Sequence, residues 1–436
     1  MTDSTALDRV LAMIEARQDE IVAFASHLIQ QPSINPDLEP NPDAERPAQE
    51  WLRDQIASFG GFEIDYWEIA PNRPNLVATR PGAGGGRSLA WSAHTDVVPV
   101  TPEQAEQWEG AGPFSGEVRD GKLWGRGASD MKGAIAAYVM AARIIKDAGV
   151  TLRGDLKLVQ SVGEEAGRRD IGCNTVLDRG HRTDFAIFPE PSNFAVYPTI
   201  KGEIYFKLTV FGKSTHICNR HLVNQPLPHG MERPGVSAID LMLKYQLAIL
   251  ELERQWNLWR SNPHVPPGGM FININTMQAG TSLTSVPDSA EATGSLLFNP
   301  DLTGQEVMDE VRATIDRVTQ GDYWLREHPP VLDLPLDSES AAPWIKEPVN
   351  LPHDHPGVVT IVETMQQVTG ETPPVTISPF VCDANFWFPL GQPCLVWGVG
   401  DPTYGIHGTN EFLPVADLIK ATKLFAAVTM AWCGVA

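Results

Sequence analysis

Short, mostly apolar segments recur along this chain and alternate with a helical periodicity, and this alternation restricts the possible folds more than any other feature. The segments are 89–93 (LAWSA), 156–162 (LKLVQSV), 185–189 (FAIFP) and 394–399 (CLVWGV). Runs of this kind are typical of strands buried on both faces of a parallel sheet. Between them, apolar residues recur every three or four positions over 131–146, as on a buried helix. The alternation predicts an α/β domain with a central, mostly parallel sheet flanked by helices.

The middle of the chain has a different order. Residues 203–211 alternate like a half-exposed antiparallel strand, and the segments that follow read helix, strand, strand, helix, strand. The order β-α-β-β-α-β predicts a smaller, ferredoxin-like α+β domain inserted into the α/β domain. The first helix of the insert is expected to carry one apolar face. That face carries Val236, Ile239, Leu243, Leu247 and Leu250.

The α/β pattern then resumes with helices expected near 357–369 and 415–431, and an opening helix is expected at 3–30. We therefore predict a catalytic domain in two parts, 1–199 and 339–436, interrupted by an insert over 200–338.

Charge and cysteine content exclude some classes of function. The chain has 54 Asp+Glu against 33 Lys+Arg, a net charge of −21, which argues against nucleic acid or an anionic membrane as a partner. No apolar run approaches the roughly 20 residues of a membrane span, and the acidic N-terminus is unlike a signal peptide. The five cysteines form no CxxC pair. We expect a cytoplasmic protein in a reducing environment.

Metal-ligating side chains follow the predicted strands where each strand ends. Because ligands bind open α/β sheets beyond the carboxyl ends of the strands, we expect these side chains to converge. Imidazole with carboxylate suits zinc, and also manganese or cobalt, and the set can hold two ions if one carboxylate bridges them. Taken singly, each residue also has an ordinary structural explanation, such as a helix N-cap or a solvated turn. The candidates are His94, Asp96, Asp130, Glu164, Glu165, Glu190 and His407.

The motifs HTD, GRGASDMKG, GEE, PEP and HGTNE together resemble those of the co-catalytic dinuclear metallopeptidase family. That family includes acetylornithine deacetylase, succinyl-diaminopimelate desuccinylase, aminoacylase and carboxypeptidase G. The resemblance implies a phosphorylase/hydrolase-like catalytic domain. It also implies that His94 and Glu190 bind one metal ion, that Glu165 and His407 bind a second, and that Asp130 bridges them.

The same resemblance implies roles for two more carboxylates. Asp96 is expected to hydrogen-bond the far nitrogen of His94 and so fix its tautomer. Glu164 is expected to be the general base, which takes a proton from the attacking water and delivers it to the leaving amine. The peptide bond after Asp130 is expected to be cis.

The segment Gly212–His216 resembles the family's Gly-x-x-x-His segment. In the family, this histidine reaches into the active site of the partner subunit, where it acts on the oxyanion. The resemblance therefore implies a homodimer formed through the insert, which serves as both dimerisation domain and lid, with His216 as a catalytic residue.

Two positions depart from the family pattern. Thr284 stands where the family often has a substrate-binding asparagine, and the arginine that follows it in the family is absent. Arg220 or Arg233 could bind a substrate carboxylate instead, and Asp383 is a further candidate for the substrate pocket.

We therefore expect hydrolysis of the amide C–N bond of a small N-acylated amino acid or a related compound. One alternative is hydrolysis of the C–N bond of a non-peptide or aromatic amine, that is, a hydrolytic deaminase. Another is an inactive binding or scaffold homologue, against which the retained Glu164 argues.

Overall fold

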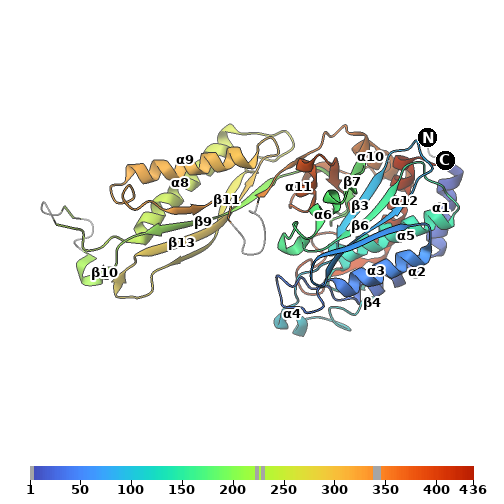
Figure 1. Ribbon diagram of the computed structural model, residues 1–436, viewed down its shortest axis with the longest axis horizontal. Coiled ribbons are helices and arrows are strands. Elements are labelled where there is room, and N and C mark those ends of the chain that lie inside the picture. The colour runs from blue at the N-terminus through green and yellow to red at the C-terminus, as the bar shows by residue number, and fades with distance from the viewer. Residues whose placement is uncertain (1–3, 221–224, 227–230, 337–344) are drawn as a thin grey trace. The chain divides into compact units, whose positions relative to one another are not determined.

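The computed structural model describes residues 4–220, 225–226, 231–336 and 345–436. The chain forms two compact units (Figure 1). Unit 1 comprises Met1–Ile200 and Val349–Ala436, and unit 2 comprises Lys201–Pro348. The second boundary lies later than the expected 338/339, because strand β15 (Ile345–Lys346) still pairs with strand β9 (Gly202–Phe211) of unit 2.

The main sheet of unit 1 has nine strands and is mixed. Its four central strands, β6, β3, β7 and β18, are parallel, whereas β2 and β8 pair antiparallel to them on either side. The predicted fold class is confirmed, with parallel pairing concentrated at the centre. The strands are β1 (Glu63–Ala70), β2 (Arg73–Arg80), β3 (Leu89–His94), β6 (Leu156–Ser161), β7 (Phe185–Phe188), β8 (Val196–Ile200), β16 (Val349–Asn350), β17 (Val375–Ser378) and β18 (Cys394–Val396).

Helices cover both faces of this sheet, because successive strand residues point to opposite sides. In β3, Leu89 and Trp91 belong to the hydrophobic core that also includes residues of α1, α2, α3, α5, α10 and α12, whereas Ala90 belongs to the core that includes residues of α6 and α11. The N- and C-terminal helices α1 and α12 lie side by side (Figure 1). The helices are α1 (Ser4–Ala16), α2 (Gln18–Ile29), α3 (Arg46–Phe59), α4 (Pro102–Glu106), α5 (Gly133–Asp147), α6 (Cys173–Asp178), α10 (Pro356–Thr369), α11 (Ala384–Trp387) and α12 (Val415–Cys433), with short turns η1 (Ala128–Lys132), η2 (Glu164–Ala166) and η4 (Phe388–Leu390).

A single opening helix was expected over 3–30, but the structure has two helices there. Arg17 separates α1 from α2. The Arg17 side chain pairs there with Glu20 and with Asp147 of α5, at 2.5 and 2.7 Å. A small antiparallel sheet completes the unit, with strands β4 (Glu117–Arg119), β5 (Lys122–Trp124) and β19 (Phe412–Pro414).

Unit 2 has the predicted β-α-β-β-α-β order. Its sheet runs β11-β13-β9-β14, all antiparallel, and α8 and α9 lie side by side across one face (Figure 1). Ile204, Phe206 and Leu208 of β9 belong to the core beneath these helices. The elements after β9 are β10 (Thr215–His216), η3 (Ile217–Asn219), α8 (Ala238–Trp259), β11 (Phe271–Ala279), β12 (Ser285–Val286), β13 (Ser289–Phe298), α9 (Gly304–Gly321) and β14 (Val331–Asp333).

The apolar face predicted for α8 is not the face that meets the core. Ile239, Leu243, Leu247 and Leu250 are 49, 52, 58 and 50% exposed. Of the five residues expected there, only Val236, which precedes the helix, is buried. The helix has apolar residues on two sides, and the opposite side fills the core. Those core residues are Leu241, Met242, Tyr245, Ile249, Leu252 and Trp256.

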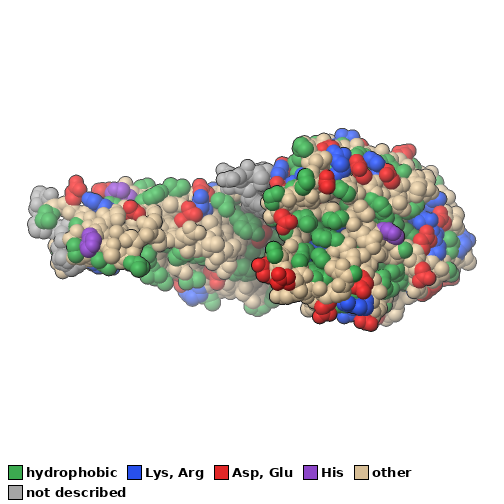
Figure 2. All heavy atoms as spheres, turned by 90° about the horizontal axis from the view of Figure 1, so that it is seen from below, with side chains coloured by type: hydrophobic (Ala, Val, Ile, Leu, Met, Phe, Trp, Pro, Cys, Tyr) green, Lys and Arg blue, Asp and Glu red, His purple; other side chains and the backbone are tan. Residues whose placement is uncertain are grey.

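Charged side chains of both signs are interspersed over the face drawn in Figure 2, so the excess of carboxylates forms no single acidic field there. Across the part of the chain that the structure describes, no helix is both long enough and apolar enough to cross a membrane.

Candidate active site

The candidate ligands lie at the carboxyl ends of the central strands, which we call the carboxyl edge. His94 is the last residue of β3, and Glu190 follows β7 by two residues. After β6, Gly163 turns the chain at φ 83°, and a Cβ there would lie 2.8 Å from the Arg168 side chain. Only glycine suits this position, and it directs Glu164 and Glu165 toward the same edge.

Pairing of β19 with β5 positions the other two ligands. The register joins Phe412 to Trp124, so the GRGASD segment after β5 lies beside the HGTNE segment before β19. Asp130 sits in η1 with extended rather than helical torsions, and His407 adopts a left-handed φ of 59°. The Asp130–Met131 peptide bond is cis, as the resemblance implied.

Four side chains converge around Asp130 and form a cluster of five residues with it. Its Oδ1 lies 3.3 Å from Nε2 of His94, and its Oδ2 lies 3.4 Å from Nε2 of His407. Glu190 Oε2 is 3.8 Å from the His94 nitrogen, and Glu165 Oε2 is 3.1 Å from the His407 nitrogen. The distances thus divide the five into two groups that share Asp130.

These residues and Glu164 line a cavity of about 210 Å³. The rest of its lining is mostly apolar and comes from loops of the same unit. Among the described lining residues there is no lysine or arginine. The apolar part of the lining, which we call the apolar wall, consists of Pro191, Phe380, Val381, Cys382, Pro402 and Ile406.

Asp96 acts differently from the expectation. The group that contacts Nδ1 of His94, at 2.9 Å, is the backbone oxygen of Asp96 and not its carboxylate, whose Oδ1 is 3.7 Å away. Because a carbonyl oxygen only accepts, Nδ1 donates and Nε2 remains available to a metal ion. The carboxylate instead accepts the backbone N–H groups of Glu164 and Glu165, at 3.2 and 3.0 Å.

A second buried carboxylate, that of Glu411, accepts backbone N–H groups at Asp130 in the same way. Glu411 Oε1 accepts the N–H groups of Ser129 and Asp130 at 3.0 and 3.1 Å. Its Oε2 pairs with Arg126 at 2.7 Å, and both side chains are at most 1% exposed. Arg126 also donates to the backbone oxygen of Gly408, next to His407, at 3.0 Å. Neither Arg126 nor Glu411 was among the candidates. The sequence signal that could have identified them is their position as charged residues within the GRG and HGTNE motifs.

Burial and mutual charge shift the protonation of the cluster. Burial raises the pKa of Glu165 to about 7 and raises that of Glu190 well above its usual range. Hydrogen bonds to Asp130 and Glu165 raise the pKa of His407 to about 10. The pKa of His94 rises well above its usual value, since Asp130 and Glu190 outweigh the opposing effect of burial. The pKa values of Glu165, Glu190, His94 and His407 therefore all lie above their usual range in this buried cluster.

The site fits divalent metal ions. Asp130 Oδ1 and Glu165 Oε1 are buried oxygens that accept no hydrogen bond from the described residues, which is costly unless a cation lies nearby. One ligand atom each from His94, Asp130 and Glu165 lies within 4.8 Å of the others. Imidazole nitrogen with carboxylate oxygen is the donor set of zinc and related ions.

The other predicted site residues are not among these five candidate ligands. Asp383 is buried and does not line the cavity; its carboxylate contacts Ser161 Oγ at 3.4 Å. Burial and the charge of Glu164 raise the pKa of Asp383 to about 7. Arg220 and Arg233 are in unit 2, where Arg220 pairs with Asp240 at 2.8 Å and Arg233 lies over a tyrosine ring.

His216 is also in unit 2 and is exposed. It pairs with Ser285 between β10 and β12, so the Gly212–His216 segment lies beside the segment that carries Thr284. Nδ1 of His216 accepts the backbone N–H of Cys218 at 3.2 Å. The hydrogen of a neutral ring is therefore on Nε2, which is available as a donor.

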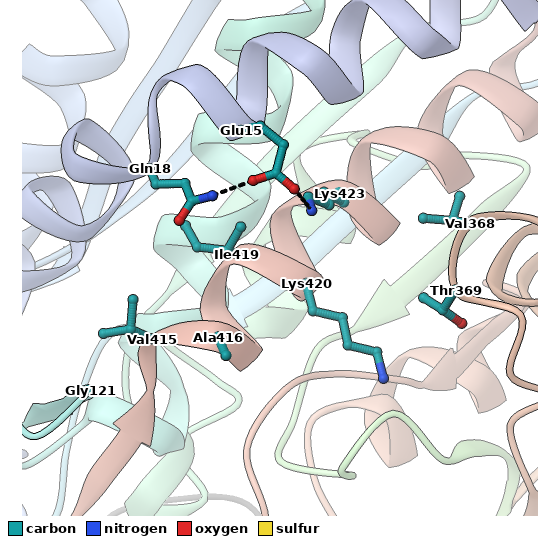
Figure 3. Close-up of a pocket in the computed structure, with 10 residues that line it drawn as sticks. All are labelled: Glu15, Gln18, Gly121, Val368, Thr369, Val415, Ala416, Ile419, Lys420 and Lys423. Carbon is teal, nitrogen blue, oxygen red and sulfur yellow. Dashed lines mark hydrogen bonds and ion pairs between the residues drawn. The ribbon is translucent and has the colours of Figure 1, made fainter.

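A larger cavity of about 540 Å³ lies between α1, α10 and α12 (Figure 3). Its two lysines are already paired, Lys423 with Glu15 and Lys420 with Glu371. Among its described lining residues there is no group of metal ligands, so the chemistry belongs to the carboxyl edge.

The chain is similar to a known protein family and to individual proteins. Residues 90–431 match the model of peptidase family M20/M25/M40. The chain is 30% identical over 433 residues to N-formyl-4-amino-5-aminomethyl-2-methylpyrimidine deformylase of Bacillus subtilis, covering 96% of each. It is 29% identical to succinyl-diaminopimelate desuccinylase of Alkalilimnicola ehrlichii, covering 94% of this chain and 98% of that one.

The fold has solved counterparts. One is the YXEP protein of Bacillus subtilis, described as a dinuclear metal-binding peptidase of the M20 family. Its TM-score is 0.64 at 16% identity, with 95% of this chain and 98% of that chain covered. At this identity the likeness shows the fold alone. The family model and the pyrimidine deformylase confirm the resemblance that the motifs carried, and the chain belongs to the M20/M25/M40 peptidase family of metal-dependent hydrolases.

Proposed function

We propose that this chain is a dinuclear metal-dependent amide hydrolase in which Glu164 is the general base. The observation that carries the proposal is the convergence of five candidate ligands. Two of their buried oxygens, Asp130 Oδ1 and Glu165 Oε1, accept no hydrogen bond from the described residues, and Glu164 lines the same cavity. His94 and Glu190 would hold one ion, and Glu165 and His407 the other, with Asp130 between them. Zinc is the first candidate, with manganese and cobalt as alternatives.

The reaction converts an amide and water into a carboxylic acid and an amine. Two divalent ions, when bound, supply the Lewis acidity that lowers the pKa of water and polarises the amide carbonyl. The Glu164 carboxylate accepts the proton of the attacking water and returns it to the nitrogen of the leaving amine. Asp96 holds the backbone at Glu164 and Glu165 by two hydrogen bonds.

The apolar wall of the cavity supports a particular substrate class. Phe380, Val381 and Ile406 line the same cavity of about 210 Å³ as the candidate ligands, and no described lining residue is a lysine or an arginine. Such a wall suits a flat, uncharged ring better than the carboxylate of an amino acid. One relative is named as a deformylase of an N-formyl aminomethylpyrimidine. We therefore favour a small acyl group on an aromatic or heteroaromatic amine over an N-acyl amino acid.

The outer face of α8 supports a homodimer. Leu243, Leu247 and their neighbours form an exposed apolar stripe, and α8 contacts β11, the edge strand of its sheet. An apolar stripe beside an open strand edge is self-complementary across a two-fold axis. In this dimer, Nε2 of His216 would donate to the oxyanion in the active site of the partner copy.

Chelation followed by metal addition tests the chemistry. We expect a chelator to abolish turnover and Zn, Mn or Co to restore it, with N-formyl and N-acetyl arylmethylamines hydrolysed faster than N-succinyl amino acids or dipeptides. Release of a carboxylic acid distinguishes amide hydrolysis from the alternative, a hydrolytic deaminase, which releases ammonia. Turnover that persists in metal-free protein would contradict the proposal. A metal-loaded chain inactive on every compound would favour the binding or scaffold alternative.

A further inference from the structure

The loop over 32–45, which joins α2 to α3, is partly buried in the core. Ser33, Asn35 and Glu45 in this loop are 0% exposed. Residues 33–35 run beside 95–97: Asn35 N–H donates to the Val97 oxygen and Val97 N–H donates to the Ser33 oxygen, both at 3.0 Å. The loop therefore lies directly against the HTD segment that carries His94.

The Asn35 amide has a fixed orientation. Its Oδ1 accepts the backbone N–H of Asp37 at 3.0 Å and faces a guanidinium nitrogen of Arg73 at 3.4 Å. Because both neighbours only donate, the oxygen must point toward them. The amide nitrogen is then turned toward Asp96, and it donates to Oδ2 at 2.7 Å.

Arg73 is held in place from behind. Its side chain is 5% exposed and makes three hydrogen bonds to the Glu45 carboxylate, at 3.1, 3.0 and 2.6 Å. It also pairs with Asp37. A guanidinium with this many partners has little freedom to move, so the donor that orients Asn35 is itself rigid.

Asp96 connects this network to the active site. It is 0% exposed, and its two carboxylate oxygens accept the N–H groups of Glu164, Glu165 and Asn35. Without Asn35, Oδ2 would keep only the Glu165 N–H. A buried carboxylate that loses a donor shifts or recruits water, and the backbone bearing Glu164 and Glu165 would move with it.

We propose that Asn35, oriented by Arg73, is a positioning residue that sets the Glu164–Glu165 pair through Asp96. This inference rests on the proposed roles of Glu164 as base and Glu165 as metal ligand. Residues that orient metal ligands from outside typically contribute about 10- to 100-fold to metal affinity or activity.

The decisive substitution is Asn35→Asp. It keeps the oxygen that faces Asp37 and Arg73 but replaces the donor to Asp96 with an oxygen that repels it. We expect kcat to fall about 10- to 100-fold with KM within about two-fold of wild type, because the substrate-binding wall is untouched. If this variant does not fold, Asn35→Ser carries the same expectation, since its hydroxyl can still accept from Asp37 but is too short to reach Asp96.

Asn41→Asp is the matched control. Asn41 lies in the same loop, accepts the N–H of Asp43 at 3.3 Å and donates to the oxygens of Ile34 and Ala44, but it does not contact Asp96. We expect its cost to appear in the melting temperature, with kcat near wild type. Equal losses of kcat in the two variants would reduce Asn35 to a residue that only stabilises the loop.

Cobalt serves as a probe that does not depend on turnover. We expect calorimetric titration of metal-free Asn35→Asp to show one of two cobalt sites weakened about 10- to 100-fold, with an altered visible absorption spectrum. Wild-type cobalt affinity, spectrum and kcat in this variant would overturn the proposal. A wild-type chain that binds two cobalt ions but hydrolyses no amide would overturn the proposed function and leave this readout valid. A wild-type chain that binds no cobalt would overturn both.

Discussion

The carboxyl edge of unit 1 and the outer face of α8 in unit 2 show opposite mismatches between a residue and its surroundings. At the edge, Asp96 and Glu411 carry charged side chains that are fully buried. On α8, Leu243 and Leu247 are exposed to solvent. Buried polar groups and exposed apolar stripes are the informative departures from ordinary burial. At the edge, backbone N–H groups of the same chain provide the partners, whereas on α8 we assign the partner to a second copy.

The largest expected effect is on the chemistry at the edge. Glu164→Gln removes the proton acceptor but keeps the shape of the side chain. We expect kcat to fall about 10²- to 10⁴-fold, with metal content by elemental analysis unchanged, because Glu164 is not one of the five proposed ligands. Undiminished turnover would refute the assignment of the base.

The next prediction concerns Glu411, whose burial is expected to affect both the stability of the chain and its affinity for metal ions. Glu411→Gln leaves the Arg126 charge buried without its partner, which costs about 3–5 kcal/mol of unfolding free energy. We also expect metal affinity to fall about 10- to 100-fold, because the amide no longer fixes the Asp130 backbone as firmly. Denaturant unfolding and cobalt titration measure the two effects.

Glu371→Gln is the control for that variant, because Glu371 forms an exposed ion pair with Lys420 at 2.6 Å. Pairs of this kind contribute about 0–1 kcal/mol. Equal losses of unfolding free energy in the two variants would mean that the buried ion pair of Glu411 stabilises the chain no more than the exposed pair of Glu371.

The proposed dimer predicts a change in assembly. The double substitution Leu243→Glu and Leu247→Glu places charges on the exposed stripe, where the expected change in unfolding free energy of each protomer is within about 0.5 kcal/mol per site. We expect wild type to sediment as a dimer and the variant as a monomer. Val359→Glu, at an exposed position on α10 of unit 1, should leave the assembly unchanged. A variant that stays dimeric would assign the interface to another surface.

Mixing two inactive variants tests the role of His216. His216→Ala and Glu164→Gln protomers, unfolded and refolded together, form mixed dimers in half of the cases. Each mixed dimer has one complete site if His216 acts across a two-fold interface, so about a quarter of wild-type activity should return. No recovery would place His216 outside the partner's active site.

Most of the candidate site residues could be located from the sequence because strand ends fix their positions. The proposed base Glu164 and the proposed ligands His94, Glu165 and Glu190 each lie at or just after the end of a recognisable buried strand, and parallel strands present their carboxyl ends at one edge. Asn35 and Glu411 could not be found this way. Asn35 contacts Asp96, which is 61 residues away in the sequence, and Glu411 accepts the backbone N–H of Asp130, which is 281 residues away. Local periodicity cannot predict contacts between segments so far apart.

The face of α8 shows a different limit. Periodicity correctly predicted an apolar stripe through Leu243 and Leu247, but it could not decide which partner covers the stripe. The helix has a second apolar side, with Tyr245 and Ile249, and only the tertiary structure shows that this side meets the sheet. Where both sides of a helix are apolar, the sequence determines neither the inward face nor its partner.

The paired backbone contacts of Asp96 and Glu411 have a consequence for how the enzyme acquires its ions. Each carboxylate binds two consecutive N–H groups, so the chain around the ligands is already ordered by bonds that involve no metal. Loading then requires little rearrangement, and its main cost is the release of protons from the ligands. A centre organised in this way should exchange one divalent ion for another without unfolding, so that the ions available in the cell, rather than the fold, decide which metal it contains.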